Sequence, residues 1–276
     1  MKKSIFSRFM KALAMEIREH KSTFIVYSVL RLAVIAVGIL QFFNGNYENV
    51  FLCILTLILL MVPSFIQLTF KVELPTTLEI IILLFIFAAE ILGEIDDYYL
   101  LFPFWDTMLH TINGFLAAAI GFSLVTLLND SEKIQFELSP IFVVIVAFCF
   151  SMTIGVVWEF FEFGMDQIFG MDTQKDTIIH ILNSVSISAD GSMTTFRDIG
   201  NVVIDGTALP IHGYLDIGLI DTMQDLIVNF IGASVFSVFG FFYIKFKGKI
   251  NLVNRFIPTK KSKDRDYLEK VINDAE

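Results

Sequence analysis

Cysteine is scarce in this chain, which has Cys53 and Cys149 among its 276 residues. Cys53 falls near one end of an apolar stretch and Cys149 in the middle of another, so we expect the two thiols to lie at different depths. The sequence therefore predicts neither a disulfide framework nor a metal site built from thiolates.

Charge is also scarce, at 18% of the residues, whereas 55% are hydrophobic and 30 are phenylalanine. A mean hydropathy of +0.69 is too high for a soluble domain and typical of a polytopic membrane protein. About 20 apolar residues are needed to cross the hydrocarbon core. Six stretches qualify, at roughly 24–43, 50–70, 77–97, 106–128, 140–165 and 221–244. We therefore expect an all-α fold, a polytopic membrane helix bundle of about six transmembrane helices.

We expect no cleavable signal peptide, because the basic start leads into an amphipathic stretch rather than a short apolar run. Residues 1–22 are predicted to form a basic amphipathic helix on the inner leaflet. Residues 23–246 form the predicted transmembrane bundle, and residues 247–276 form a basic tail. Lysine and arginine gather at both ends, so we expect both termini to be cytoplasmic in a bacterial cytoplasmic membrane.

Residues 167–220 are the one sizeable segment outside the predicted spans. Turn signals at Asp190-Gly191 and Asp205-Gly206 and the β-branched run Val202–Ile204 predict a helix followed by a small hairpin or extracytoplasmic lid between spans five and six. In this topology the net charge of −9 comes from the outer side. That distribution argues against nucleic acid as a partner and favours a cation or a cation-bridged anion.

Four predicted spans carry polar side chains three or four residues apart, so each set shares one helix face. All four sets fall at the same, outer end of the membrane. The sets are Glu90, Glu94 and Asp97; Asp106, His110 and Asn113; Glu159, Glu162 and Asp166; and Asp221, Asp225 and Asn229. Ionisable groups in membrane helices cost roughly 2.5–3.5 kcal/mol each unless they face a cavity or a partner. Because the carboxylates also repel one another, we expect a cation or shared protons among them.

A divalent metal ion is the cofactor that these sets predict, since carboxylates and an imidazole one turn apart can hold one ion together. The predicted metal ligands are Asp106, His110, Glu159, Glu162, Asp221 and Asp225. Glu90 or Glu94 is the predicted catalytic residue, acting as a general base. Asp106 and Asp221 each begin a span, so a helix-capping role is an equal alternative for these two.

Small and amide side chains within the same spans favour packing roles. Asn113 and Asn229, one turn further along their helices, are more typical of interhelical hydrogen bonds than of metal binding. Gly114, Gly121 and Gly232 would let neighbouring helices approach closely. We therefore expect the polar end of the bundle to combine helix packing with a candidate site.

Three motifs carry a resemblance to a known family: Asp106–Gly114, Trp158–Phe163 and Asp221–Ala233. Over about residues 80–245 the chain resembles the YjdF-like bacterial inner-membrane proteins, which implies a polytopic membrane protein without an established activity. The order of these residues is also similar to VanZ-like membrane proteins associated with envelope phenotypes. The arginine that those proteins carry between the Glu helix and the last Asp helix has no obvious equivalent here, unless Arg197 serves.

The leading functional hypothesis is a metal-dependent hydrolase or transferase that acts on a lipid-linked envelope substrate at the outer face. A cation or proton-coupled transporter is the main alternative, although the inner halves of spans four to six are almost continuously apolar and offer no path through the membrane. A third possibility is a non-catalytic bundle with a structural polar cluster. The expected partners are the lipid bilayer and a lipid-linked substrate, with no nucleic acid.

Overall fold

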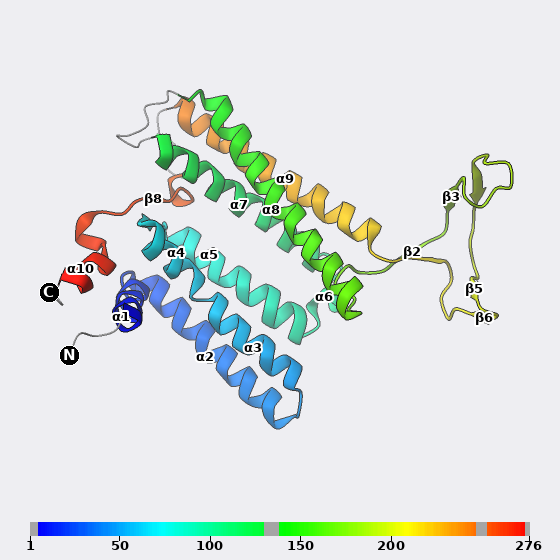
Figure 1. Ribbon diagram of the computed structural model, residues 1–276, viewed down its shortest axis with the longest axis horizontal. Helices are drawn as coiled ribbons and strands as arrows, with labels where there is room; N and C mark the ends of the chain where they lie inside the picture. The colour runs from blue at the N-terminus through cyan, green and yellow to red at the C-terminus, as the bar shows by residue number, and fades with distance from the viewer. Residues whose placement is uncertain (1–4, 130–137, 247–252, 274–276) are drawn as a thin grey trace. The chain divides into compact units, whose positions relative to one another are not determined.

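The computed structural model describes residues 5–129, 138–246 and 253–273 (Figure 1). Parts of the two predicted terminal segments, residues 1–4, 247–252 and 274–276, lie outside the described residues. The chain divides into two compact units, of which the second is Thr153–Val228 and the first is the remainder. Two long helices contribute residues to both units.

The chain is mainly helical. Its helices are α1 (Ile5–Ile17), α2 (Lys21–Phe43), α3 (Tyr47–Leu59), α4 (Val62–Phe70), α5 (Thr76–Phe87), the π-helix η1 (Ala88–Ile95), α6 (Tyr98–Leu101), α7 (Trp105–Asn129), α8 (Pro140–Phe169), α9 (Leu219–Lys245) and α10 (Tyr267–Asn273), with single 3-10 turns at Val253–Arg255 and Lys263–Arg265. Its strands are β1 (Val72–Glu73), β2 (Thr177–Ile179), β3 (Leu182–Ser184), β4 (Thr194–Phe196), β5 (Val203–Ile204), β6 (Thr207–Ala208), β7 (Tyr214–Asp216) and β8 (Thr259–Lys260).

Five stretches of helix within the described residues are long and apolar enough to cross a membrane: α2, α3 with α4, α7, α8 and α9. They coincide with five of the six predicted spans, so the multi-span helical architecture is confirmed. The sixth predicted span, 77–97, forms α5 with 12 residues and runs directly into η1 with 8. A count of six transmembrane helices therefore stays a prediction.

Proline explains the break inside the second span. Helix α3 ends at Leu59 and α4 begins at Val62, with Pro63 in the first turn of α4. Proline has no N–H to continue the hydrogen-bond ladder and fits only the start of a helix. Pro63 therefore marks the break between α3 and α4.

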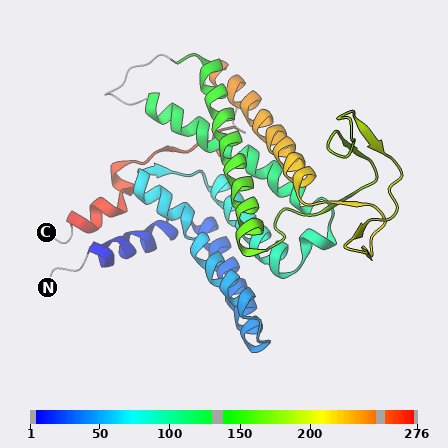
Figure 2. The same ribbon diagram turned by 45° about the vertical axis from the view of Figure 1, so that its right-hand side comes forward.

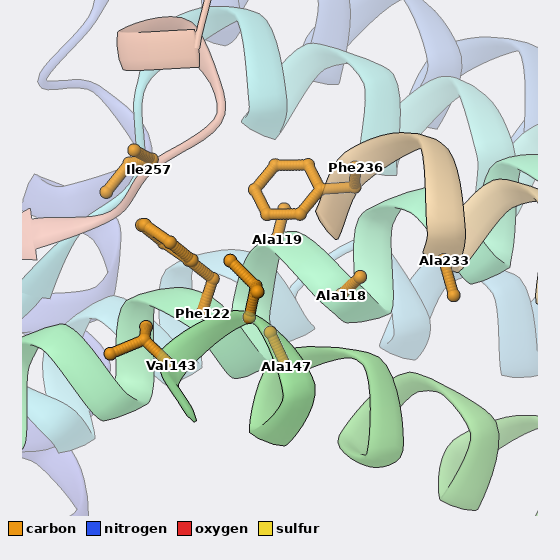
Figure 3. Close-up of a cluster of buried hydrophobic side chains, with 9 residues drawn as sticks. Ala118, Ala119, Phe122, Val143, Ala147, Ala233, Phe236 and Ile257 are labelled. Carbon is orange, nitrogen blue, oxygen red and sulfur yellow. The ribbon is translucent and has the colours of Figure 1, made fainter. Parts of the chain in front are cut away.

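The core of the first unit lies where α7 packs against the first part of α8 and the second part of α9. Figure 3 shows its buried side chains, which are Ala118, Ala119, Phe122, Val143, Val144, Ala147, Ala233, Phe236 and Ile257. The alanines keep the helices close enough for the rings of Phe122 and Phe236 to meet edge to face, with centroids 5.8 Å apart. A second buried cluster joins α2, α3, α5 and η1.

Two glycines allow α7 and α9 to touch at backbone distance. A Cβ atom on Gly114 would overlap the carbonyl oxygen of Asn229, and one on Gly232 would overlap the carbonyl oxygen of Thr111. On α7, a Cβ atom at Gly121 would also press on the Phe150 ring of α8. The predicted role of these glycines in close helix packing is thus confirmed.

The terminal segments of the first unit pack together. Helix α1 forms where helical spacing predicts it, and its Ala12 and Leu13 are buried against Leu68 of α4 and Val271 of α10. Both Figure 1 and Figure 2 show α1 and α10 as neighbours. Strand β8 pairs antiparallel with β1. The apolar face of α1 therefore has a protein partner, and its contact with the inner leaflet stays a prediction.

The second unit holds the rest of α8, the first turns of α9 and three antiparallel strand pairs, β2–β7, β3–β4 and β5–β6 (Figure 2). The predicted hairpin is confirmed. The prediction of a helix before it is wrong, because α8 ends at Phe169 and Gly170 follows with a φ of +66°. A glycine in this left-handed conformation is a common helix stop. The pairing of β2 with β7 brings the two ends of the segment together.

We expect Gly232→Ala to lower the unfolding temperature of the detergent-purified protein, because the new methyl group forces α7 and α9 apart. Overpacking of this kind costs about 1–3 kcal/mol. Thermal unfolding followed by circular dichroism measures the effect. Gly164→Ala is the matched control, since a Cβ atom there meets nothing within 4 Å. Equal unfolding temperatures for the two variants would contradict the close contact.

Candidate functional site

Helix α7 places an imidazole beside a carboxylate. His110 Nε2 lies 3.5 Å from Asp106 Oδ1, one turn earlier on the same face. Asp106 lies in the first turn of α7 and is half-buried, whereas His110 is only 7% exposed. The first unit thus brings together two of the six predicted metal ligands.

One turn further along α7, amide side chains join three helices. Asn113 Nδ2 donates to Asn229 Oδ1 of α9 at 3.4 Å, and Asn229 Nδ2 donates to the Ser151 carbonyl oxygen of α8 at 3.4 Å. Ser151 Oγ donates to the Gly114 carbonyl oxygen at 2.7 Å, and both Ser151 and Asn229 are 0% exposed. We call Asn113, Ser151 and Asn229 the amide layer. It confirms the interhelical role predicted for the two asparagines.

Ser151 was not predicted from the sequence. A serine within an apolar helix commonly donates to a carbonyl of its own preceding turn, so its sequence context carries no sign of an interhelical bond. Here the hydroxyl donates instead to the carbonyl oxygen of Gly114 on the neighbouring helix α7. The signal that could have found it is the pairing of a small residue on one helix with a hydroxyl on the next.

The second unit contributes a pair of carboxylates on α8. Glu159 and Glu162 each offer an oxygen, and these two oxygens lie within 4.8 Å of each other. Glu159 is buried, Glu162 is half-buried, and Asp225 on α9 is buried as well. Two carboxylates this close repel each other when both are ionised, so the pair is suited to a cation or a shared proton.

Asp166, the third member of the α8 set, organises the chain that follows the helix. Its Oδ1 accepts hydrogen bonds from Thr173 N and Thr173 Oγ1, both at 2.6 Å, and its Oδ2 accepts one from Gln174 N at 2.9 Å. Thr173 Oγ1 also donates to the Glu162 carbonyl oxygen at 2.9 Å. Asp166 therefore fixes the exit of α8.

Asp221 has a similar role at the entry of α9. Its Oδ2 accepts a hydrogen bond from Lys175 N at 2.7 Å, so it binds the neighbouring loop. Asp216, which sequence reasoning missed, accepts the hydrogen bond of Ile220 N at 2.8 Å and thereby satisfies a free N–H of the first turn. Gln174 Nε2 adds a bond to Thr222 Oγ1 at 2.5 Å. The loop after α8 is therefore tied to the start of α9.

The same loop concentrates negative charge. Burial and the charges of Asp172, Asp166 and Asp216 raise the pKa of Asp176 above its ordinary value, and Lys175 opposes them only in part. Gly218 in this region has a φ of +106°. A side chain at this position would press on Gln174 Cβ. The acidic character predicted for this end of the spans is present in the second unit.

Glu90 and Glu94, the predicted catalytic residues, lie in the π-helix η1. Glu90 is half-buried and Glu94 is exposed. Ile91 and Ile95 of the same turns are buried in the cluster with α2 and α3. A π-helical turn inside an α-helix is often found at functional sites. The role of either glutamate as a base stays a prediction, as does the sharing of one ion by all six predicted ligands.

We expect Asp166→Ala to loosen the extramembrane segment, because three hydrogen-bond donors of Thr173 and Gln174 lose their acceptor. Limited proteolysis of the purified protein should cut residues 170–218 faster in this variant than in the wild type. Asp172→Ala is the control, since the exposed Asp172 side chain accepts none of these three bonds. Equal cleavage rates in all three proteins would refute the role given to Asp166.

Comparison with known proteins agrees with this architecture. The family described as "Predicted membrane protein (DUF2238)" matches residues 25–246. An uncharacterized protein of Thermotoga maritima is 23% identical over 163 residues, which are 57% of this chain and 75% of the relative. No solved structure matches the chain. Because the family match extends over all five candidate spans except the start of the first, the chain belongs to the DUF2238 family of predicted membrane proteins.

Proposed function

We propose that this integral membrane protein is a metal-dependent hydrolase or transferase that acts on a lipid-linked envelope substrate from the outer face of the membrane. The observation that carries the proposal is the contact of the buried His110 with Asp106, beside the amide layer that fixes the register of α7, α8 and α9. A buried imidazole next to a carboxylate is a common arrangement in metal sites and general-base sites.

The proposed ligands lie within one or two helical turns of the amide layer along their own helices. His110 precedes Gly114 by one turn on α7, and Asp225 precedes Asn229 by one turn on α9. Glu159 follows Ser151 by about two turns on α8, which runs without a break to Phe169. Three helices held at one level thus each carry an ionisable residue within one or two turns of it. His110 belongs to the first unit and Glu159 and Asp225 to the second, and the metal measurement below tests whether they bind one ion together.

The donor set fits a divalent ion of the first transition row. Asp106, Glu159, Glu162, Asp221 and Asp225 offer carboxylate oxygens and His110 offers an imidazole nitrogen, a mixture that suits manganese, iron or zinc. A bound ion would supply Lewis-acid polarisation of a phosphoryl or carbonyl oxygen. Glu90 or Glu94 would take the proton of the attacking hydroxyl. The apolar remainder of the spans would keep water from the inner side away from the reaction.

A non-catalytic bundle is the second candidate. The amide layer favours it, because Asn113 and Asn229 already use their polar atoms to join helices. In that case carboxamide substitutions at Glu159 or Asp225 would change stability without changing metal content. The metal measurement below separates the two candidates.

We expect purified wild-type protein to carry about one or two divalent ions per chain, as one- and two-metal enzymes do. Glu159→Gln and Asp225→Asn should each lose them, because an amide oxygen is a weaker ligand than a carboxylate. Mass spectrometry of metals in folded protein measures the content, and Asp172→Asn is the exposed acidic control. If the wild type holds no ion after incubation with Zn²⁺, Mn²⁺ or Mg²⁺, the metalloenzyme proposal fails.

The proposed orientation can be tested with single cysteines. In a Cys53→Ser/Cys149→Ser background, a membrane-impermeant maleimide added to intact cells should label Asp205→Cys, which lies in the extramembrane segment. It should label Lys270→Cys in α10 only after lysis, because both termini are proposed to be cytoplasmic. Labelling of Lys270→Cys in intact cells would show that the topology is the reverse of the proposed one. The candidate site would then lie on the cytoplasmic side.

A further inference from the structure

An arginine lies in the middle of α2, the first candidate span. Arg31 follows Lys21, the first residue of α2, by ten residues, which is about 15 Å along the helix axis. Its side chain is half-buried, and it forms no ion pair with a carboxylate among the described residues. A charged side chain at this depth of a membrane is rare and costly, and it commonly marks a functional site.

Tyr27 holds the guanidinium group of Arg31. Arg31 Nη1 donates to the Tyr27 hydroxyl, and Arg31 Cζ lies 5.8 Å from the centroid of the Tyr27 ring. Tyr27 is 7% exposed and belongs to the buried cluster that joins α2, α3, α5 and η1. The arginine side chain is thus directed toward the start of α2, as long side chains of helices usually are. A neutral hydroxyl occupies one of its five N–H donors and leaves the positive charge uncompensated.

A groove between α2 and α3 begins one helical turn after Arg31. Its wall on α2 starts at Val34 and Ile35, three and four residues after Arg31 and therefore on the same face of the helix. The two helices lie side by side (Figure 1). The groove has a volume of about 450 Å³, which is within the range of small-molecule binding sites.

The groove is apolar and open to the outside of the bundle. Charged, amide and hydroxyl side chains are absent from its wall, and the wall residues Ile39 and Ile54 are each 53% exposed. At Gly38 the helices are close, since a Cβ atom there would lie 3.3 Å from Cys53 Cβ. The wall on α2 ends at Phe43, so it extends about 14 Å from Val34, or roughly half the thickness of a hydrocarbon core. Its length and lining fit one acyl chain.

We propose that Arg31 and this groove bind one anionic phospholipid, with the phosphate on the Arg31 guanidinium group and an acyl chain in the groove. Arginine matches phosphate oxygens with paired N–H donors. The depth of Arg31 connects the two parts of the site. A phosphate bound there lies deeper than those of neighbouring lipids in the leaflet at the start of α2, so its chain extends past the midplane of the membrane, where the groove receives it.

This lipid site goes beyond the proposed metal-dependent function and does not rest on it. Helices α2 and α3 contain none of the six proposed metal ligands and neither of the two proposed bases. Lipid binding can therefore be measured in the presence of EDTA, which removes any contribution from a divalent ion. Failure of one proposal leaves the other unaffected.

The test titrates full-length, detergent-purified protein with palmitoyl-oleoyl phosphatidylglycerol in EDTA and counts bound lipid by native mass spectrometry. Wild-type protein should bind one molecule, and Arg31→Gln should bind it at least about tenfold more weakly, because the phosphate loses its cation. Arg31→Lys should retain part of the affinity, since it keeps the charge but not the paired donors. Phosphatidylcholine with the same chains should respond less to Arg31→Gln, because its choline group already balances the phosphate.

The groove is tested with a matched pair of tryptophan variants. Ile39→Trp should weaken phosphatidylglycerol binding, because the indole fills the groove. Leu32→Trp is the control and should bind as the wild type does, since Leu32 is 67% exposed on the same helix but lies outside the groove wall. Equal affinities of these two variants would refute the placement of the chain.

Equal binding of phosphatidylglycerol to the wild type and to folded Arg31→Gln would overturn the proposal and identify the contact of Arg31 with Tyr27 as structural only. If Arg31→Gln does not fold, thermal unfolding of the wild type provides the test. Phosphatidylglycerol should raise the unfolding temperature more than phosphatidylcholine does, because a ligand that binds only the folded state stabilises it. Equal shifts with the two lipids would contradict an anion-selective site.

Discussion

The polar end of the first unit depends on the hydrogen bonds that the Asn229 side-chain amide forms with two other helices. A helix in hydrocarbon satisfies its own backbone, but a buried side-chain amide must find partners on other helices. Asn229 finds them on α7 and α8, and this is possible only because Gly114 and Gly232 bring α7 and α9 to backbone contact. The glycines and the Asn229 amide therefore depend on each other, because the close helix contact and the hydrogen bonds occur together.

Ionisable residues of each unit follow the same requirement. In the second unit, Asp166 and Asp221 are not simply members of an acidic stripe, because each accepts hydrogen bonds from the loop between α8 and β2. In the first unit, Glu16 is matched by Lys261, which is 245 residues away in the sequence. The partners of Asp221 and Glu16 come from segments that are distant along the chain, whereas those of Asp166 lie seven and eight residues away.

The candidate site gains a clearer division of roles from these contacts. Asp166, Asp216 and Asp221 organise the loop, and Asn113 and Asn229 organise the helices. His110 with Asp106, and Glu159 with Glu162, are the pairs whose chemistry suits an ion. Among the six proposed metal ligands, these four have a defined neighbour on their own helix, whereas Asp221 also binds the loop after α8.

Spacing and composition within single segments are enough to predict the apolar spans, the amphipathic helix α1 and the helix faces that carry the polar sets, and they explain the break at Pro63. Three features became visible only in the folded chain: Ser151 joins the amide layer, the chain after Gly170 forms strand pairs instead of a helix, and residues 253–273 pack on α1. The Ser151 contact, the β2–β7 pair and the packing of residues 253–273 depend on partners far away in the sequence. Local pattern encodes which side a residue faces, but it does not encode what it meets there, because that is set by the packing of segments whose sequences are independent.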